Sequence, residues 1–120
     1  MEVETSHINL SYLIEMSDNS PGFVKEIANI FKSQIPIFNE RFETCIKNKD
    51  LSEFKKIAHK AKCAVGVMGM VALEQKLKII DDSQESVLCE NDILEVSNLF
   101  REVCDQALLE IDEAICKMVL

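Results

Sequence analysis

The sequence predicts an all-α protein, an antiparallel up-down-up-down four-helix bundle with a short extra helix at the N-terminus. Three observations lead to this fold class. Apolar residues recur three and four positions apart through most of the chain, which is the period of an amphipathic helix. Capping and turn-forming residues divide this pattern into segments, and no segment alternates as a strand would. Four amphipathic helices joined by short loops bury their apolar stripes most simply as such a bundle.

The length of the chain predicts one domain. Its 120 residues are enough for one compact core and too few for two, so residues 1–120 are expected to form a single unit. Apolar residues make up 48% of the chain, but no apolar run approaches the roughly 18 residues that would span a membrane. The opening Met-Glu-Val-Glu-Thr lacks the basic flank and apolar stretch of a signal peptide. We therefore expect a cytoplasmic protein with no membrane partner.

The N-terminal part predicts one short helix. Residues 1–8 are polar and expected to be frayed, and they include His7, which we interpret as an incidental terminal histidine. Asn9 is suited to cap a helix that follows it. The apolar side of this short helix would consist of Leu10, Leu13 and Met16.

A long helix is predicted from Pro21 to about Asp50. Ser20 suits the N-cap, and Pro21 suits the first helical position because its missing N–H has no helical partner there. The predicted apolar stripe consists of Phe23, Ile27, Phe31, Ile35, Phe38, Phe42 and Ile46. Pro36 lies inside this stripe, and the period resumes beyond it, which favours a bend over a break.

The next helix is predicted to begin after Asp50. Asp50 and Glu53 form the pattern of a capping box. The apolar residues then follow one side of a helix: Leu51, Phe54, Ala58, Ala61, Val65 and Met68. Gly66 and Gly69 are expected to loosen the end of this helix and permit a tight turn.

Two further helices complete the predicted fold. The first carries Leu73, Leu77 and Ile80 inward and fades in the polar run from residue 81 to residue 86. The second is predicted to start at Asp92, with Glu95 completing another capping box. Its stripe runs almost to the end of the chain: Ile93, Val96, Phe100, Val103, Ala107, Ile111, Ala114 and Met118.

One histidine stands among lysines on the helix that follows Asp50. At about 100° per residue, His59 lies on the outward side of that helix and is expected to meet solvent. The segment between Phe54 and Leu73 has no carboxylate, in a chain whose net charge is −8, and it contains Lys55, Lys56, Lys60 and Lys62. Lysines on a helix are most often simply solvated. This positive cluster beside a histidine is nevertheless also suited to an anionic group.

The motif around His59 resembles that of the histidine-containing phosphotransfer (HPt) domains of multistep phosphorelays. That family has a histidine, a lysine three residues later, a glycine directly after the lysine, and then small residues and further glycines. The matching residues are His59, Lys62, Ala64, Gly66 and Gly69, with Leu73 on the next helix. Cys63 stands where the family usually has glycine. Residues 9–13 and 21–50 look like the family's short opening helix and first long helix.

The resemblance implies a phosphocarrier and not an enzyme. His59 would accept a phosphoryl group on Nε2 from the aspartyl phosphate of one receiver domain and pass it to the aspartate of another. A neutral imidazole is a good nucleophile near neutral pH. Because the phosphoryl group is negatively charged, Lys62 is expected to stabilise it, and Lys55 is expected to assist or to steer the partner. The implied partners are receiver domains of a hybrid histidine kinase and of a response regulator, which would supply the Mg²⁺; no cofactor of the chain's own is expected.

Docking of a receiver requires that no bulky side chain obstruct its approach to His59. Small residues such as Ala64 and Gly66 avoid such obstruction or let helices approach closely. Cys63, Gly66 and Lys56 are therefore expected at the docking surface. The thiol of Cys63 adds bulk at the position of the usual glycine, which would slow transfer, narrow the choice of receiver or introduce sensitivity to oxidation. For Gly69, the sequence is equally consistent with a role that is limited to the helix end and to packing, without a part in docking.

Composition excludes several other functions. A net charge of −8 argues against nucleic acid as a partner, because phosphate backbones demand a broad basic surface. The cysteines are five in number, without a Cys-x-x-Cys pair, which argues against a zinc site and a disulfide framework: Cys45, Cys63, Cys89, Cys104 and Cys116. Since every predicted helix has one stripe that the bundle can bury, a monomer is expected.

Two alternatives to the phosphocarrier stay open at this point. The first keeps the fold without the chemistry, as a docking module that binds receivers or kinases and is never phosphorylated. The second is a helical bundle that binds a metal or oligomerises through an exposed helix face, although paired His and carboxylate ligands at helical spacing are missing. An ATP-dependent histidine kinase is excluded, because 120 residues leave no room for a nucleotide-binding domain.

Overall fold

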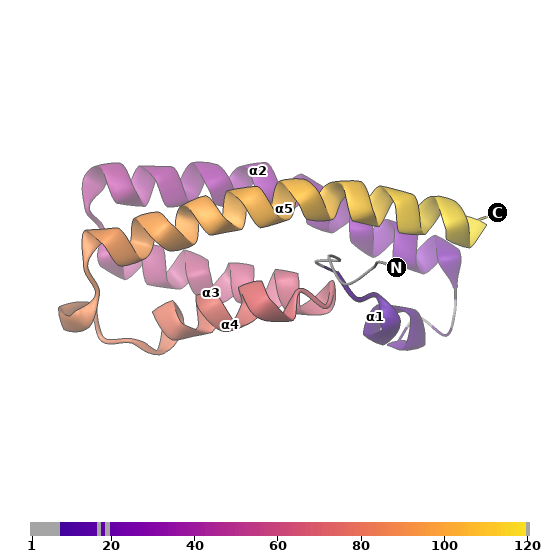
Figure 1. The fold of residues 1–120 in the computed structure, drawn as a ribbon, viewed down its shortest axis with the longest axis horizontal. Helices are drawn as coiled ribbons and strands as arrows, with labels where there is room; N and C mark the ends of the chain where they lie inside the picture. Colours follow the sequence, from indigo (N-terminus) through magenta and orange to yellow (C-terminus); the bar gives the residue numbers. More distant parts are fainter. Residues whose placement is uncertain (1–7, 17, 19, 120) are drawn as a thin grey trace, which may run out of the picture.

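The computed structural model describes residues 8–16, 18 and 20–119, except for the side chains of Tyr12, Met118 and Val119 (Figure 1). Within this part of the chain the structure is helical throughout and contains no strand, which confirms the predicted all-α class. The helices are α1 (Ser11–Met16), α2 (Pro21–Asn48), α3 (Leu51–Val67), α4 (Val71–Asp82), the 3₁₀ turn η1 (Glu85–Val87) and α5 (Glu90–Val119). The predictions for His7 and the Met118 side chain fall outside the described residues.

The long helices lie alongside one another in an elongated arrangement of 49 × 29 × 21 Å. Helix α2 packs against α3 and α5, and α4 packs against α3 and α5. Figure 1 shows that successive long helices run in opposite directions, with α2 and α5 extending past the end of the α3–α4 pair. Helix α1 lies beyond that end and contacts α2. No helix among the described residues combines the length and apolar character needed to cross a lipid bilayer.

Side chains at two helix starts act as the sequence predicts. The Phe23 amide donates to Ser20 Oγ at 3.3 Å, with Pro21 as the first residue of α2. The Glu53 amide donates to Asp50 Oδ1 at 3.1 Å at the start of α3. This is half of the predicted capping box, because the Asp50 amide donates to Cys45 O at 2.9 Å instead of to the Glu53 side chain. These contacts satisfy amide groups that have no partner inside the helix, so each fixes where its helix begins.

The predicted start of α5 is wrong by two residues. The helix was expected to start at Asp92, but α5 begins at Glu90. The Cys89 amide donates to Asp92 Oδ2 at 3.0 Å, so Asp92 caps the helix from within its first turn. Hydrogen bonds from the backbone and side chain of Cys89 hold the pKa of the Asp92 carboxyl below its usual value. The carboxylate also suits this position because the helix dipole is positive at the N-terminal end.

The core is centred on three phenylalanines from different helices. The ring centroids of Phe42 and Phe54 lie 4.7 Å apart, and those of Phe42 and Phe100 lie 5.3 Å apart with nearly perpendicular planes. Phe42, Phe54 and Phe100 are completely buried. This cluster joins α2, α3 and α5, and it fixes the inward side of α3.

The predicted stripe of α2 is shifted by one residue at its two ends. Phe23 is 41% exposed, and Ile27 and Ile46 are only partly buried. The residues that fill the core from α2 are Val24, Ala28, Phe31, Ile35, Phe38, Phe42 and Cys45. Helix α2 continues without interruption through Pro36, as expected from the resumed period. Leu10, just before α1, and Leu13 within α1 are buried as predicted, but Met16 is 51% exposed.

The remaining stripes agree with the structure except near Val103 in α5, where the neighbouring Cys104 fills the core. In α3 the buried residues include Phe54, Ala58, Ala61 and Val65, with Leu51 partly buried. In α4 the buried residues are Leu73, Leu77 and Ile80, as predicted. In α5 the core contains Ile93, Val96, Phe100, Ala107 and Ile111, while Val103 and Ala114 are partly buried and Cys104 is fully buried.

Candidate functional site

Helix α3 places His59 on the solvent side of the molecule. Neighbouring Ala58 and Ala61 are completely buried, so the packing of α3 against α2 and α4 turns the intervening side outward. The His59 side chain is 59% exposed. This confirms the predicted exposure, which follows from the helical period alone.

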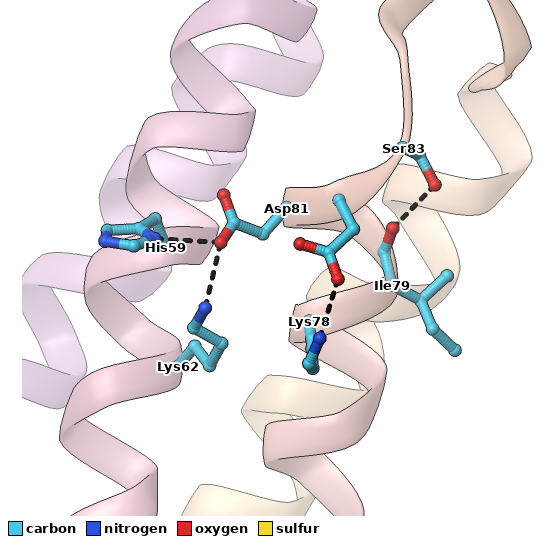
Figure 2. A network of polar contacts seen from close by, with 7 residues as sticks. His59, Lys62, Lys78, Ile79, Asp81 and Ser83 are labelled. Atoms are coloured by element: carbon cyan, nitrogen blue, oxygen red, sulfur yellow. Dashed lines mark hydrogen bonds and ion pairs between the residues drawn. The ribbon is translucent and has the colours of Figure 1, made fainter.

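A carboxylate from α4 lies against this histidine. His59 Nδ1 lies 2.8 Å from Asp81 Oδ2, and Lys62 Nζ donates to the same oxygen at 2.9 Å (Figure 2). The side chains of Lys62 and Asp81 are each 20% exposed. A single oxygen atom near the end of α4 therefore joins two residues of the His59 motif.

The electrostatics of this group favour its charged form. Hydrogen bonds with His59 and then Lys62 hold the pKa of the Asp81 carboxyl below its ordinary value of 3.8. The hydrogen bond with Asp81 in turn raises the pKa of the Lys62 ammonium. Asp81 is consequently a carboxylate and Lys62 an ammonium across the neutral pH range.

Asp81 is the residue that the sequence interpretation missed. It was assigned only to the polar end of α4, and the histidine was expected in surroundings without a carboxylate. One signal points to such a role: Asp81 and Asp82 stand in the last turn of a helix, where the dipole disfavours negative charge unless a cation is near. Each carboxylate does have a cation nearby, since Asp81 accepts from Lys62 and Asp82 Oδ2 accepts from Lys78 Nζ at 2.8 Å.

The other nitrogen of the His59 ring points away from Asp81 and Lys62 (Figure 2). Beside the histidine lies an open pocket of about 470 Å³ between α3 and the end of α4. Its lining residues are Ser52, Glu53, Lys55, Lys56, Ile57, His59, Lys60, Asp81 and Glu85. The structure thus brings Lys55 and Lys56 to the same pocket as the histidine, whereas Lys62 lies against Asp81.

The small residues near the site have different surroundings. Cys63 is exposed, so its thiol stands on the outer surface of α3 next to Lys62. Gly66 faces α4, where an added Cβ would meet Glu74 Oε2 at 2.8 Å. Because the neighbour is the end of a flexible side chain, Gly66 serves the approach of α3 to α4 without demanding glycine absolutely.

Gly69 has a structural role. Its φ is +70°, and an added Cβ would lie 2.0 Å from the backbone oxygen of Asn9. The Asn9 amide donates to Met68 O at 3.0 Å, which ties the chain before α1 to the turn between α3 and α4. Only glycine fits this conformation and this close approach.

A second hollow adjoins the first on the α2 side. This pocket of about 360 Å³ is lined by Gln34, Ile37, Phe38, Arg41, Ile57 and Lys60. Ile57 and Lys60 line both pockets. Ile37 is 53% exposed, so an apolar side chain stands at this surface between the cations Arg41 and Lys60. The surface next to His59 therefore has two adjoining pockets, and the second of them is a partly apolar depression over α2 and α3.

The candidate site contains no group of metal ligands. Across the residues that the structure describes, no three His, Cys, Asp or Glu side chains come together in a way that could hold a metal ion. The comparisons with protein-family models, curated proteins and solved structures found no match to this chain.

Proposed function

We propose that this chain is a histidine phosphocarrier of the HPt type, arranged as an up-down-up-down four-helix bundle. His59 would accept a phosphoryl group from one receiver domain and yield it to another. The observation that carries the proposal is the state of the imidazole: one ring nitrogen contacts a carboxylate, and the other points away from it on an exposed helix face. That is the arrangement a nucleophilic histidine needs when its substrate is presented by a second protein.

The surroundings of His59 suit a phosphoryl group held by a partner. Lys55 and Lys56 line the pocket beside the ring, and their positive charges would stabilise the equatorial oxygens of the transferring group. The pocket is wide and open, so it does not by itself exclude water or orient a small substrate. We therefore assign the in-line geometry and the Mg²⁺ to the docked receiver, and no ATP-dependent activity to this chain.

The depression over α2 and α3 supports docking of a protein partner. Its apolar part around Ile37 offers surface that association would remove from water. Its cations, Arg41 and Lys60, and the lysines beside His59 would meet an acidic receiver surface and speed encounter. Lys56 lines the pocket beside His59, and both Lys56 and Cys63 are exposed on α3. Docking over this face would place a receiver's aspartyl phosphate near His59.

The test is the intact mass of the protein after incubation with phosphoramidate, a small donor that phosphorylates histidine. The wild-type protein is expected to gain one phosphoryl group that is labile to acid and stable to alkali. His59→Gln is expected to gain none, while His7→Gln, which changes the other of the two histidines, behaves as wild type. Unmodified wild-type protein would refute the carrier, and retained binding to receivers would then favour the unphosphorylated docking module.

A further inference from the structure

We propose that the second pocket, between α2 and α3, binds a small amphipathic anion of the class of the aromatic carboxylates, and that its occupancy blocks docking of a receiver. The effect on docking rests on the proposed function, whereas the binding does not. The pocket has a volume of about 360 Å³ and shares Ile57 and Lys60 with the pocket beside His59. Ligand sites measure roughly 300–1,000 Å³, so this pocket suits a small ligand.

The apolar part of the pocket is held in place by the core. Phe38 is 8% exposed and Ile57 is 2% exposed, so both side chains are fixed by their neighbours. The Phe38 ring packs against Phe100 with centroids 5.9 Å apart and nearly perpendicular planes. Ile37 is 53% exposed and adds apolar surface that a ligand would cover. A rigid ring suits this surface, because it buries apolar area with little loss of conformational freedom.

The charged part of the pocket is positive. Arg41 comes from α2 and Lys60 from α3, and no carboxylate of the described residues lines the pocket. The α5 side of α2 differs, because Lys32 Nζ lies 2.6 Å from Asp112 Oδ1 there. Within the described part of the chain, Arg41 and Lys60 form no ion pair. Their charges are therefore available to one carboxylate, which a guanidinium can bind through two parallel hydrogen bonds.

An occupied pocket would oppose docking of a receiver in two ways. The ring of the ligand would cover Ile37, and its carboxylate would neutralise the cations that attract an acidic partner. Phosphoramidate is small enough to reach the exposed His59 side chain without a docking surface. The ligand is therefore expected to slow transfer from a receiver and to leave phosphorylation by phosphoramidate unchanged.

The first experiment measures binding of 1-naphthoate by ¹H–¹⁵N NMR of the backbone amides. The amide signals of residues 34–41 and 57–60 are expected to shift together, with a dissociation constant of about 1 mM for so small a ligand. Two compounds separate charge from apolar area. Neutral 1-naphthalenemethanol lacks the carboxylate and acetate lacks the rings, so each is expected to bind at least about tenfold more weakly.

Two pairs of variants assign the site. Arg41→Gln removes one cation and Ile37→Gln removes apolar surface, and each is expected to weaken binding of 1-naphthoate about three- to tenfold. The matched controls are Lys47→Gln and Ile30→Gln, which change exposed residues of the same helix that line neither pocket. Both controls are expected to bind as the wild type does. A thermal melt of each variant establishes that it is folded.

The second experiment measures phosphorylation of the wild type at about ten times the dissociation constant of 1-naphthoate. A competitor at this concentration weakens the apparent affinity of the receiver about tenfold, so transfer at a low receiver concentration is expected to slow about tenfold. The rate with phosphoramidate as the donor is expected to stay the same. An equal fall with both donors would contradict competition for the docking surface.

The two proposals fail in different ways. Equal affinity of the wild type and folded Arg41→Gln, equal affinity for the neutral alcohol, or signals that shift only outside the lining residues would overturn the binding site, and the carrier would stand. Binding at the pocket without slower transfer would overturn the effect on docking. If neither donor phosphorylates the wild type, the proposed function fails together with the effect on docking, and the NMR titration alone decides the binding site.

Discussion

At the scale of residues, the exposure of His59 follows from the sequence, but its principal partner does not. The outward direction of His59 is fixed by the apolar period of α3, which the chain shows directly. Asp81 belongs to a different helix, and only the packing of α4 on α3 brings it to Nδ1. Sequence patterns locate a side chain on its own helix, whereas a contact between helices depends on their register.

The change in the free energy of unfolding at acid pH tests the ionisation of Asp81. Its pKa is lowered in the folded protein, so the ionised carboxylate stabilises the fold above the ordinary value of 3.8, and this contribution disappears as pH falls through the lowered value. Asp81→Asn is therefore expected to lower the free energy of unfolding at pH 7 and to have little effect near pH 2. Urea unfolding at several pH values measures the difference. An effect of Asp81→Asn that does not change with pH would contradict the ionised pair.

Gly69 provides a second test at this scale. Alanine at this position would keep a φ of +70° and bring its Cβ 2.0 Å from the Asn9 oxygen, so the backbone would have to move. We expect Gly69→Ala to destabilise the protein by more than about 1 kcal/mol. Gly22→Ala is the matched control, since its Cβ would meet only Ser20 Oγ at 4.0 Å and alanine is the better helix former. Urea unfolding that finds equal stability for both variants would contradict the assigned role of Gly69.

At the scale of elements, α2 shows where a periodic pattern is ambiguous. Two neighbouring rows of this helix are apolar, and each follows the helical period. One row is buried, and the adjacent row contains the exposed Phe23, Ile30 and Ile37. The sequence predicts that α2 is an amphipathic helix, but the choice between rows depends on where α1, α3 and α5 lie against it. The predicted stripe was wrong at Phe23, which is exposed, whereas Ile27 is partly buried against the core.

Replacing one phenylalanine from each row of α2 and measuring the stability of each variant tests which row is buried. Phe42 is completely buried between rings of α3 and α5, and Phe42→Ala should cost about 3–5 kcal/mol in the free energy of unfolding. Phe23 is 41% exposed at the other end of the helix, and Phe23→Ala should cost about 1 kcal/mol or less. Chemical denaturation of both variants provides the comparison. Equal losses would show that the assignment of the buried row is wrong.

At the scale of the whole molecule, the sequence predicts more of the fold than of the site. The all-α class and most helix starts follow from local signals, such as Ser20 and Asp50, which act within a few residues of themselves. The pocket beside His59 combines residues of α3, α4 and η1, and the adjoining one combines α2 and α3. Such surfaces exist only after the helices have packed. That is why the proposed docking surface includes residues beyond those of the motif.

The depression over α2 and α3 can be tested through Ile37. A carboxylate at this position removes apolar surface and opposes an acidic partner, so Ile37→Glu should weaken binding of a receiver about tenfold, which corresponds to about 1.4 kcal/mol. Ile79→Glu is the matched control, because Ile79 is 60% exposed on α4 and lines neither pocket. Titration calorimetry with a receiver that phosphorylates the wild type gives both affinities. Equal weakening by the two variants would place docking elsewhere.

The most direct test of the central claim is transfer from a phosphorylated receiver domain, followed by the intact mass of both proteins. We expect the receiver to lose its phosphoryl group as the wild-type chain gains one, and His59→Gln to leave the receiver phosphorylated. Phosphorylation of His59→Gln to the wild-type level would contradict the account, because the acceptor would then be a different residue.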